Sequence, residues 1–270
     1  MNGLKGKPLD GKAVIVTGSS RGIGRETALM FGLLGAHIVL HGRDTEALAR
    51  SRAYLAGRGV DAVAYGCDVT DADGCRNLVR TCLDSYGRLD VLVNNAGLSM
   101  RGNFADLVPE VVERIVGTNI TGAILPTIAA LPALRETQGS VVFVSTVAAL
   151  HGFPRVSIYS AAKMSLTAIA QSLEAELHSD GVHVGVAYLP FVENDEDKLS
   201  LSTDGSLISV HRRAQISQSA AAEAIVRLVR RRHRRTVPSG VGRLLVACER
   251  IAPRLVQSVL NGSGGRFHRQ

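Results

Sequence analysis

The sequence predicts a single-domain, doubly wound α/β/α sandwich with a mostly or wholly parallel sheet of about seven strands. Short β-branched runs alternate with longer helical patterns along most of the chain, and that alternation is typical of parallel α/β folds. The apolar runs are nearly continuous, as expected for strands that are buried on both faces. Because no linker divides the 270 residues, we expect one domain over residues 1–270.

The elements follow from the periodicity of apolar residues and from Gly, Pro and capping residues between the runs. The predicted strands are residues 13–17, 37–41, 61–65, 89–93, 140–145 and 182–188. The predicted helices are residues 22–34, 45–57, 72–86, 109–134, 157–178 and 219–233, with an amphipathic stretch at 244–260. We expect residues 191–218 to form a substrate lid and residues 261–270 to be a flexible tail.

The net charge of +7 is unevenly distributed along the chain. Residues 201–270 hold 13 arginines and three acidic residues, a net charge of +10, whereas residues 1–200 carry −3. The main body is therefore not expected to bind nucleic acid. Six of these arginines lie between Arg227 and Arg235, at the end of a predicted helix. They are explained either as solvated residues that complement the helix dipole or as a weak contact for anionic lipids or an acidic carrier protein.

The cysteines and the N-terminus indicate a cytoplasmic protein. Cys67, Cys75, Cys82 and Cys248 are scattered, without the close spacing of a zinc or dithiol site, so we expect no metal site. Residues 1–10 lack the apolar core of a signal peptide. No uncharged apolar run is expected to span a bilayer, which leaves peripheral membrane contact open.

A glycine-rich loop joins the first predicted strand to the first predicted helix. The glycines Gly18, Gly22 and Gly24 permit a tight turn and a close approach of the backbone to a diphosphate, which would bind at the helix N-terminus. Their Gly-x-x-x-Gly-x-Gly spacing resembles that of the short-chain dehydrogenase/reductase family. The resemblance implies a Rossmann-type fold whose loop residues also bind the cofactor, here Ser20, Arg21 and Ile23. The alternative is that these are turn glycines only.

The residues after the second predicted strand favour NADP(H) over NAD(H). An NAD-selective protein places an acidic residue there to bind the ribose 2′-hydroxyl, but this chain has Gly42 followed by Arg43. The guanidinium of Arg43 suits a 2′-phosphate, and Arg21 can approach the same group. The alternative is that Arg43 is a solvated residue beside Asp44, which we expect to cap the next helix.

Three further segments extend the resemblance to the cofactor site. Asp68 and Val69 correspond to the adenine contact of the family, and Asn95-Ala96-Gly97 belongs to its Asn-Asn-Ala-Gly motif. After the sixth strand the family has Pro-Gly and then a threonine. Here Phe191 either replaces the glycine or follows its deletion, and with a deletion Asn194 takes the threonine position. The resemblance then assigns cofactor contacts to Pro190, Val192 and Asn194.

The chemistry is predicted from Tyr159 and Lys163, which lie four residues apart and therefore on one face of a helix. A lysine cation favours the phenolate and brings a tyrosine toward a useful pKa for general acid/base catalysis. In similar enzymes the lysine also binds the nicotinamide ribose.

The resemblance implies two further catalytic residues and the contacts of the substrate. Thr146 lies 13 residues before the tyrosine, at the position of the catalytic serine of the family, with Ser145 as the minority assignment. Asn119 matches an asparagine that supports a proton relay to the lysine. We expect Ser145, Thr146, Phe153 and Tyr159 to contact the substrate.

Two functional hypotheses follow. The first is an NADPH-dependent reductase of hydrophobic ketones, reversible as an alcohol dehydrogenase, which acts as a homodimer or homotetramer. The second is a non-catalytic NADPH-binding regulatory protein, supported by the departures at Thr146 and Phe191. Apolar lid residues such as Leu201 and Leu207 suit a hydrophobic substrate or pack the lid itself.

Overall fold

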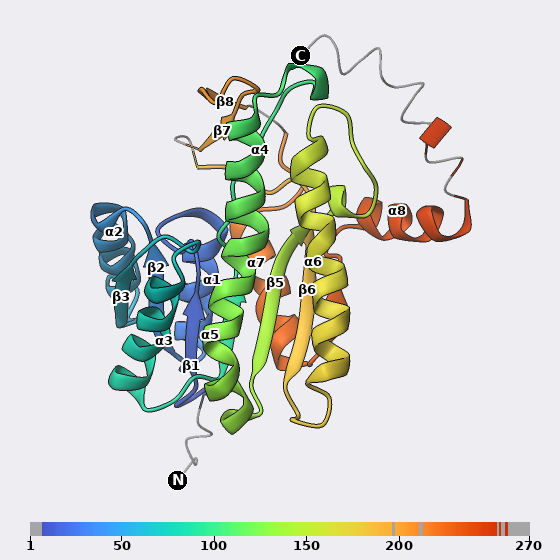
Figure 1. Ribbon diagram of the computed structural model, residues 1–270. Helices are drawn as coiled ribbons and strands as arrows, with labels where there is room; N and C mark the ends of the chain where they lie inside the picture. The colour runs from blue at the N-terminus through green and yellow to red at the C-terminus, as the bar shows by residue number, and fades with distance from the viewer. Residues whose placement is uncertain (1–6, 196–197, 211–212, 253, 255–256, 259–270) are drawn as a thin grey trace.

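A computed structural model describes residues 7–195, 198–210, 213–252, 254 and 257–258 (Figure 1). Within them, seven strands form one parallel sheet in the order β3-β2-β1-β4-β5-β6-β9. The strands are β1 (Ala13–Val16), β2 (His37–Gly42), β3 (Ala62–Gly66), β4 (Val91–Asn94), β5 (Ser140–Thr146), β6 (His183–Leu189) and β9 (Arg235–Thr236). The predicted fold class is therefore confirmed, whereas the predicted tail at residues 261–270 lies outside the described residues.

Helices cover both faces of the sheet, as the two main apolar clusters show. One cluster joins the sheet to α3 (Ala72–Tyr86), α5 (Gly122–Thr137) and α6 (Ser157–Glu176). The other joins it to α1 (Gly22–Leu33), α2 (Thr45–Ala56) and α7 (Gln218–Arg230). Every helix on these two faces starts within two residues of its predicted start, except α5, because capping and glycine signals are local.

The predicted helix at residues 109–134 is the main correction to the secondary structure. It consists of α4 (Pro109–Val116), a π-helical turn (Gly117–Thr121) and α5. A π turn inserts an extra residue into the helical ladder, and periodicity alone does not show it. By length and mean hydropathy, 1.4, the stretch Pro109–Thr137 could cross a membrane, which the sequence analysis did not expect. It packs against the sheet through buried residues of α5.

Smaller differences lie at the edges of the fold. The strand β3 is only half-buried, because it is the edge of the sheet. The amphipathic stretch predicted at 244–260 begins earlier, as α8 (Gly240–Ile251), and projects from the body (Figure 1). The strand β9 was not predicted because it has only two residues and is recognisable only by its pairing with β6.

Residues 191–218 contain a small hairpin, β7 (Leu199–Leu201) and β8 (Leu207–Ser209), which lies above α4 in Figure 1. The backbone N–H of Leu201 donates to the carbonyl of Ser99 at 2.9 Å, and the N–H of Arg101 donates to the carbonyl of Leu201 at 2.8 Å. The side chain of Leu201 is fully buried beside Met100. This leucine therefore packs the segment onto the loop that follows β4.

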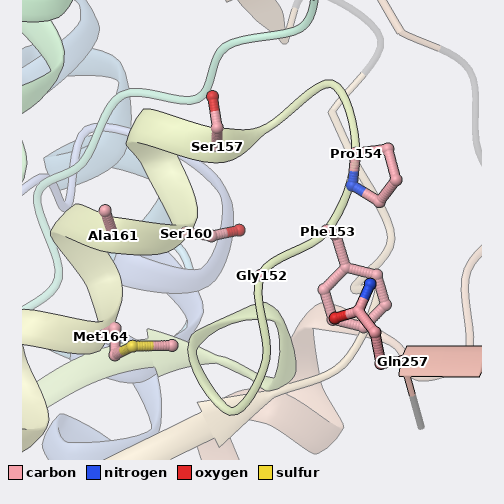
Figure 2. A pocket seen from close by; sticks show the side chains of 8 residues that line it. All are labelled: Gly152, Phe153, Pro154, Ser157, Ser160, Ala161, Met164 and Gln257. Atoms are coloured by element: carbon pink, nitrogen blue, oxygen red, sulfur yellow. The ribbon is translucent and has the colours of Figure 1, made fainter. Parts of the chain in front are cut away.

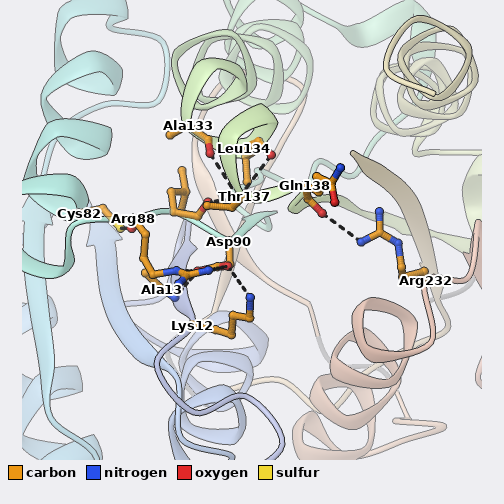
Figure 3. A network of polar contacts seen from close by, with 11 residues as sticks. Lys12, Ala13, Cys82, Arg88, Asp90, Ala133, Leu134, Thr137, Gln138 and Arg232 are labelled. Atoms are coloured by element: carbon orange, nitrogen blue, oxygen red, sulfur yellow. Dashed lines mark hydrogen bonds and ion pairs between the residues drawn. The ribbon is translucent and has the colours of Figure 1, made fainter. Parts of the chain in front are cut away.

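Polar residues close the opposite end of the sheet, where the strands begin (Figure 3). The carboxylate of Asp90 accepts hydrogen bonds from the backbone N–H of Ala13 (2.9 Å), from Lys12 Nζ (3.0 Å) and from Arg88 (2.6 and 2.7 Å). Burial would raise the pKa of Asp90, but the hydrogen bonds from Arg88, Ala13 and Lys12 outweigh it and lower that pKa. Asp90 thus joins the starts of β1 and β4.

Candidate active site

The glycine loop lies at the carboxyl end of β1, where the segment after β4 holds it. The hydroxyl of Thr17 accepts hydrogen bonds from the backbone N–H groups of Asn95 and Ala96, both at 3.0 Å. The Asn95 side-chain amide donates to the carbonyls of Thr17 (2.9 Å) and Gly18 (3.0 Å). The two predicted motifs therefore support each other directly.

Two of the three loop glycines are required by close contacts. Gly18 has φ +62°, and a Cβ there would lie 2.8 Å from Ala96 Cα. A Cβ on Gly24 would lie 2.3 Å from the carbonyl oxygen of Gly18. No side chain at these positions fits without moving the backbone, so the loop can keep its shape only with glycine.

The N-terminus of α1 opens toward the segment that follows β6. Its N-cap residue, Arg21, makes no side-chain capping bond in the described structure, so the first backbone N–H groups of α1 can receive an anion. Asp195 lies here as well, with Oδ2 3.2 Å from the position that a Cβ on Gly22 would take. Asp195 also accepts a hydrogen bond from Gln218 Nε2 at 3.0 Å. Sequence reasoning missed this carboxylate because the family pattern assigned its neighbour.

Asn194 and Asp195 line a cavity of about 650 Å³ on the outer side of α1. Val192 forms a β-bridge with Ile216 and packs into the apolar cluster beneath α1 and α7. Pro190 lies directly after the last residue of β6.

The adenosine end of the cleft is expected where β2 and β3 end. Arg43 Nη1 lies 3.5 Å from Asp68 Oδ2, and both side chains are exposed. Burial would raise the pKa of Asp68, but hydrogen bonds from Thr70 and then the Arg43 guanidinium hold it below its usual value. Asp44 caps α2 by accepting from the N–H of Ala47 at 3.0 Å. Val69 is buried beside them.

Lys163, Asn119 and Gly97 meet at the centre of the site. A Cβ on Gly97 would lie 2.9 Å from Asn119 Oδ1 and 3.1 Å from Lys163 Nζ, so these polar atoms flank the backbone of Gly97. Lys163 is buried and donates to the carbonyl of Val144 at 3.0 Å. Burial, and then repulsion from Lys198, lower the pKa of Lys163 to about 8.

Asn119 is held firmly in the π-helical turn that interrupts the long crossover helix. Its side-chain NH₂ donates to the carbonyls of Leu98 (2.8 Å) and Ile115 (2.9 Å), and its Oδ1 accepts from the N–H of Leu98 at 3.3 Å. The side chain is only 1% exposed. The π turn therefore places this amide beside Lys163 and the loop after β4.

Ser145 and Thr146, at the end of β5, have different environments. Ser145 is buried, and its hydroxyl donates to the backbone carbonyl of Lys163 at 3.0 Å. Thr146 is half-buried and accepts from the N–H of Ala148 at 3.2 Å, which leaves its own hydroxyl proton available as a donor. Tyr159 lies half-buried against an apolar cluster that includes Met100 and Leu201.

Phe153 lines a cavity beside α6. It lines a cavity of about 460 Å³ between its own loop and one side of α6, as Figure 2 shows. The other residues that line this cavity are Gly152, Pro154, Ser157, Ser160, Ala161, Met164 and Gln257. Tyr159 and Lys163 are on another side of the helix and are not among them. The contact of Phe153 with the substrate stays a prediction.

Comparison with known proteins shows the family of the chain. Residues 12–203 match the family model described as short chain dehydrogenase. The chain belongs to the short-chain dehydrogenase family. The family comprises oxidoreductases that act on CH–OH and C=O groups.

Two curated relatives and one solved structure indicate how far the similarity reaches. Dehydrogenase/reductase SDR family member 7B of Bos taurus is 33% identical over 204 residues, which are 73% of this chain and 63% of that protein. The 11-beta-hydroxysteroid dehydrogenase 1A of Arabidopsis thaliana is 33% identical over 239 residues, 84% and 68% of the two chains. This short-chain dehydrogenase thus spans less than two thirds of its bovine relative.

A short chain dehydrogenase/reductase from Burkholderia phymatum, solved in complex with NAD, superimposes with a TM-score of 0.81. The match covers 92% of this chain and 96% of that one at 21% identity, so it shows the shared fold. Within this short-chain dehydrogenase, the residues fit a nicotinamide dinucleotide. The uncapped N-terminus of α1 and the glycine cradle suit a diphosphate, and the backbone of Gly97 lies beside Lys163.

Proposed function

We propose that this protein is an NADPH-dependent oxidoreductase that reduces the ketone of a hydrophobic small molecule to an alcohol, or catalyses the reverse reaction. The observation that carries the proposal is the buried ammonium of Lys163, one helical turn from Tyr159 and beside Gly97. Within the described residues this ammonium has no carboxylate partner, and a cation buried in that way is costly unless function requires it.

The roles of the side chains follow from this geometry. Bound NADPH would supply the hydride. Tyr159 would give its phenolic proton to the carbonyl oxygen, and the hydroxyl of Thr146 would donate a hydrogen bond to that oxygen. Lys163 would stabilise the phenolate that remains and bind the nicotinamide ribose. Asn119, whose Oδ1 lies beside Gly97 together with Lys163 Nζ, would support the return of a proton to the site.

The assignment of Thr146 rather than Ser145 rests on what each hydroxyl already does. The Ser145 hydroxyl donates its proton to the carbonyl of Lys163, whereas in the described part of the chain Thr146 Oγ1 accepts one hydrogen bond and donates none. Ser145 would therefore position Lys163 through its backbone carbonyl, and Thr146 would contact the substrate. Threonine retains the donor, and its additional methyl group narrows the site.

The preference for NADPH rests on the adenosine end of the cleft. Arg43 follows Gly42, and the nearest atoms to a Cβ on Gly42 would be those of Ser20, at 3.3 Å. Because residue 42 is glycine, this position carries no side-chain carboxylate that could recognise a ribose 2′-hydroxyl. The weak ion pair with Asp68, at 3.5 Å between two exposed groups, leaves Arg43 able to turn toward a 2′-phosphate.

The remaining parts of the proposal concern the lid, the partners and the compartment. Residues 191–218 would cover the substrate, since Leu201 anchors their hairpin beside Tyr159 in one apolar cluster. The exposed Ile128 and Met164, on α5 and α6, support a homo-oligomer. All four cysteines are free, in keeping with a reducing, cytoplasmic setting.

The arginine-rich segment is partly explained by contacts within the fold. Arg227 pairs with Glu223, Arg234 pairs with Glu174, and Arg232 donates to the carbonyls of Gln138 and Gly181. These contacts support a structural role at the amino end of the sheet. A lipid or carrier-protein contact would depend on the other arginines of the segment, Arg230, Arg231 and Arg235, which are exposed.

Turnover with a panel of hydrophobic ketones tests the proposed activity. We expect NADPH oxidation by the unsubstituted protein and a loss of about 10³-fold in kcat/KM for Tyr159→Phe, because the phenol is the proton donor. Tyr54→Phe, which removes a phenol that bonds Glu26 on the outer side of α1, is the matched control and should retain activity. Equal activity of Tyr159→Phe and the unsubstituted protein would contradict the mechanism. NADPH binding without Tyr159-dependent turnover would favour the regulatory alternative.

Cofactor choice is tested separately by Arg43→Ala. We expect the Kd for NADPH to rise about tenfold or more, with little change for NADH, because only the 2′-phosphate needs the guanidinium. Arg50→Ala, an exposed arginine on α2 that pairs with Glu46, is the control. An equal loss for both cofactors would remove the basis for the NADPH preference.

A further inference from the structure

A histidine and two cysteines lie together behind the adenosine end of the cleft, and the proposed mechanism does not use them. His41 is the next-to-last residue of β2 and is 2% exposed. Its Nε2 lies 3.4 Å from the Sγ of Cys67, the half-buried residue that follows β3. Among the described residues no group of three or more His, Cys, Asp and Glu side chains could hold a metal ion.

The glycine loop determines which nitrogen of His41 carries the proton. The backbone N–H of Gly18 donates to His41 Nδ1 at 3.3 Å, so Nδ1 is an acceptor. In a neutral imidazole the proton then lies on Nε2, which donates to Cys67 Sγ. A donor aimed at sulfur favours the thiolate, the reactive form of cysteine.

The second thiol lies next to the first, in the first turn of α3. A Cβ on Gly74, the residue before Cys75, would lie 2.8 Å from Cys67 Cβ and 3.1 Å from Cys67 Sγ. Cys75 is fully buried, and its Sγ donates to the carbonyl of Val69 at 3.4 Å.

The pKa values of the two thiols are shifted in opposite directions, as a redox pair with one nucleophilic and one resolving cysteine requires. Contact with Cys75 and then with His41 lowers the pKa of Cys67, against the opposing effects of burial and of Asp71. Contact with Cys67 and then burial raise the pKa of Cys75. One sulfur is therefore the accessible nucleophile, and the other is a buried thiol within its reach.

We propose that Cys67 is a peroxide-reactive cysteine, that Cys75 is its resolving partner, and that their disulfide weakens cofactor binding. The thiolate of Cys67 attacks one oxygen of hydrogen peroxide, the O–O bond breaks, and hydroxide leaves, which forms a sulfenic acid. The sulfur of Cys75 then attacks Cys67 Sγ, the S–O bond breaks, and the oxygen leaves as water with the Cys75 proton. The hydroxide takes up the proton that Cys67 released when its thiolate formed, so two cysteines are oxidised to one disulfide and one peroxide is reduced to two waters.

The disulfide would act on the cofactor site along two short routes. It closes a ring over the segment that contains Asp68 and Val69, and it removes the bond from Cys75 Sγ to the Val69 carbonyl. It also removes the thiolate acceptor of His41, whose other nitrogen binds the backbone of Gly18. The effect of the disulfide on cofactor binding rests on the proposed function, whereas the oxidation of the two cysteines does not.

Peroxide treatment of the full chain, followed by peptide mass spectrometry, tests the chemistry. We expect a Cys67–Cys75 disulfide, and a dimedone-trapped sulfenic acid at Cys67 in Cys75→Ala. Cys248 is the matched control, since it is also half-buried. Alkylation at pH 6.5 should modify Cys67 before Cys248, and His41→Asn should slow the reaction of Cys67 because it removes the Nε2 donor.

Titration with NADPH tests the consequence. The Kd should rise about fivefold or more on oxidation and return after reduction, while peroxide should not change the Kd of Cys67→Ser. Preferential oxidation of Cys248, or a stable sulfenic acid at Cys67 with Cys75 unreacted, would overturn the proposal. If the reduced protein does not bind NADPH, the proposed function fails, and the mass spectra still decide the redox pair.

Discussion

The two ends of the same parallel sheet use polar residues in different ways. At the amino end, Asp90 accepts four hydrogen bonds from three residues, and all of its donors belong to the fold. At the carboxyl end, Lys163 is buried beside Gly97 with a carbonyl as its hydrogen-bond acceptor and no carboxylate partner within the described residues. The amino end therefore stabilises the fold, and the carboxyl end retains charge and donors for a ligand.

The two ends differ in whether the buried charged group has a counter-ion, and this distinguishes structural from functional polar groups. A buried charge with a complete set of partners is stabilising, whereas one without a counter-ion costs stability and remains available for chemistry. The pKa values have opposite consequences as well. The pKa of Asp90 is lowered, which favours its charged form, while burial lowers the pKa of Lys163 to about 8, which disfavours its charged form.

The largest expected effect is at Lys163. Lys163→Met should reduce kcat/KM about 10³-fold, because the ammonium that supports Tyr159 is lost, while the free energy of unfolding at pH 7 should not fall. The folded-state pKa lies below that of the unfolded chain, so the cost of the buried charge is present below pH 8. It fades as the pH rises from about 8 to 10.5, and the unsubstituted protein should gain stability relative to the variant over that range.

Lys12→Met is the matched control at the amino end, since Lys12 pairs with Asp90 and is half-exposed. It should leave kcat/KM unchanged. Steady-state kinetics and urea unfolding of both variants measure the contrast. A large loss of stability in Lys163→Met would indicate that this lysine belongs to the scaffold, as Asp90 does.

A smaller effect is expected at the end of β5, where the two kinds of polar group are adjacent. Thr146→Val should lower kcat/KM about 10²-fold, and Thr146→Ser should restore most of it, because only the hydroxyl donor is needed. Ser145→Ala should lose about 1 kcal/mol of stability with its bond to the Lys163 carbonyl. If kcat/KM falls in Ser145→Ala but is retained in Thr146→Val, the roles assigned to the two residues must be exchanged.

The smallest effect on activity is expected for Asp90→Asn, which should leave kcat/KM unchanged and lower the free energy of unfolding by about 2–3 kcal/mol. Because the folded-state pKa of Asp90 is below its usual 3.8, the stabilisation is present above about pH 4. It is lost as the pH falls through the folded-state value. Urea unfolding at pH 7 and pH 3 should therefore show a smaller difference between variant and unsubstituted protein at pH 3.

Asp180→Asn is the control for this contrast. Asp180 pairs with Arg135 at 2.7 Å, but the pair is largely exposed, so its removal should cost less than 1 kcal/mol. Equal losses for the two aspartates would show that the network at the amino end is no stronger than a surface ion pair.

Local patterns predicted most of the fold and indicated the candidate site residues. The glycine loop, the Asn-Asn-Ala-Gly segment and the Tyr159–Lys163 spacing are all read over a few residues, and the order of strands and helices follows from periodicity. The split of the long helix at Gly117–Thr121 was missed, since apolar periodicity continues through a π turn. The cavity that Phe153 lines beside α6 was not predicted either, because the direction of a loop is not a local property.

By itself, the sequence determined the fold class, the cofactor loop and the residues that were candidates for catalysis. Only the tertiary structure showed that Ser145 is already bonded, that Asp195 faces Gly22 and that His41 connects Gly18 to Cys67. The physical reason is the range of the interactions. Helix periods and turn residues act between near neighbours, whereas these contacts join segments 18 or more residues apart, which only the packing of the sheet and its helices brings together.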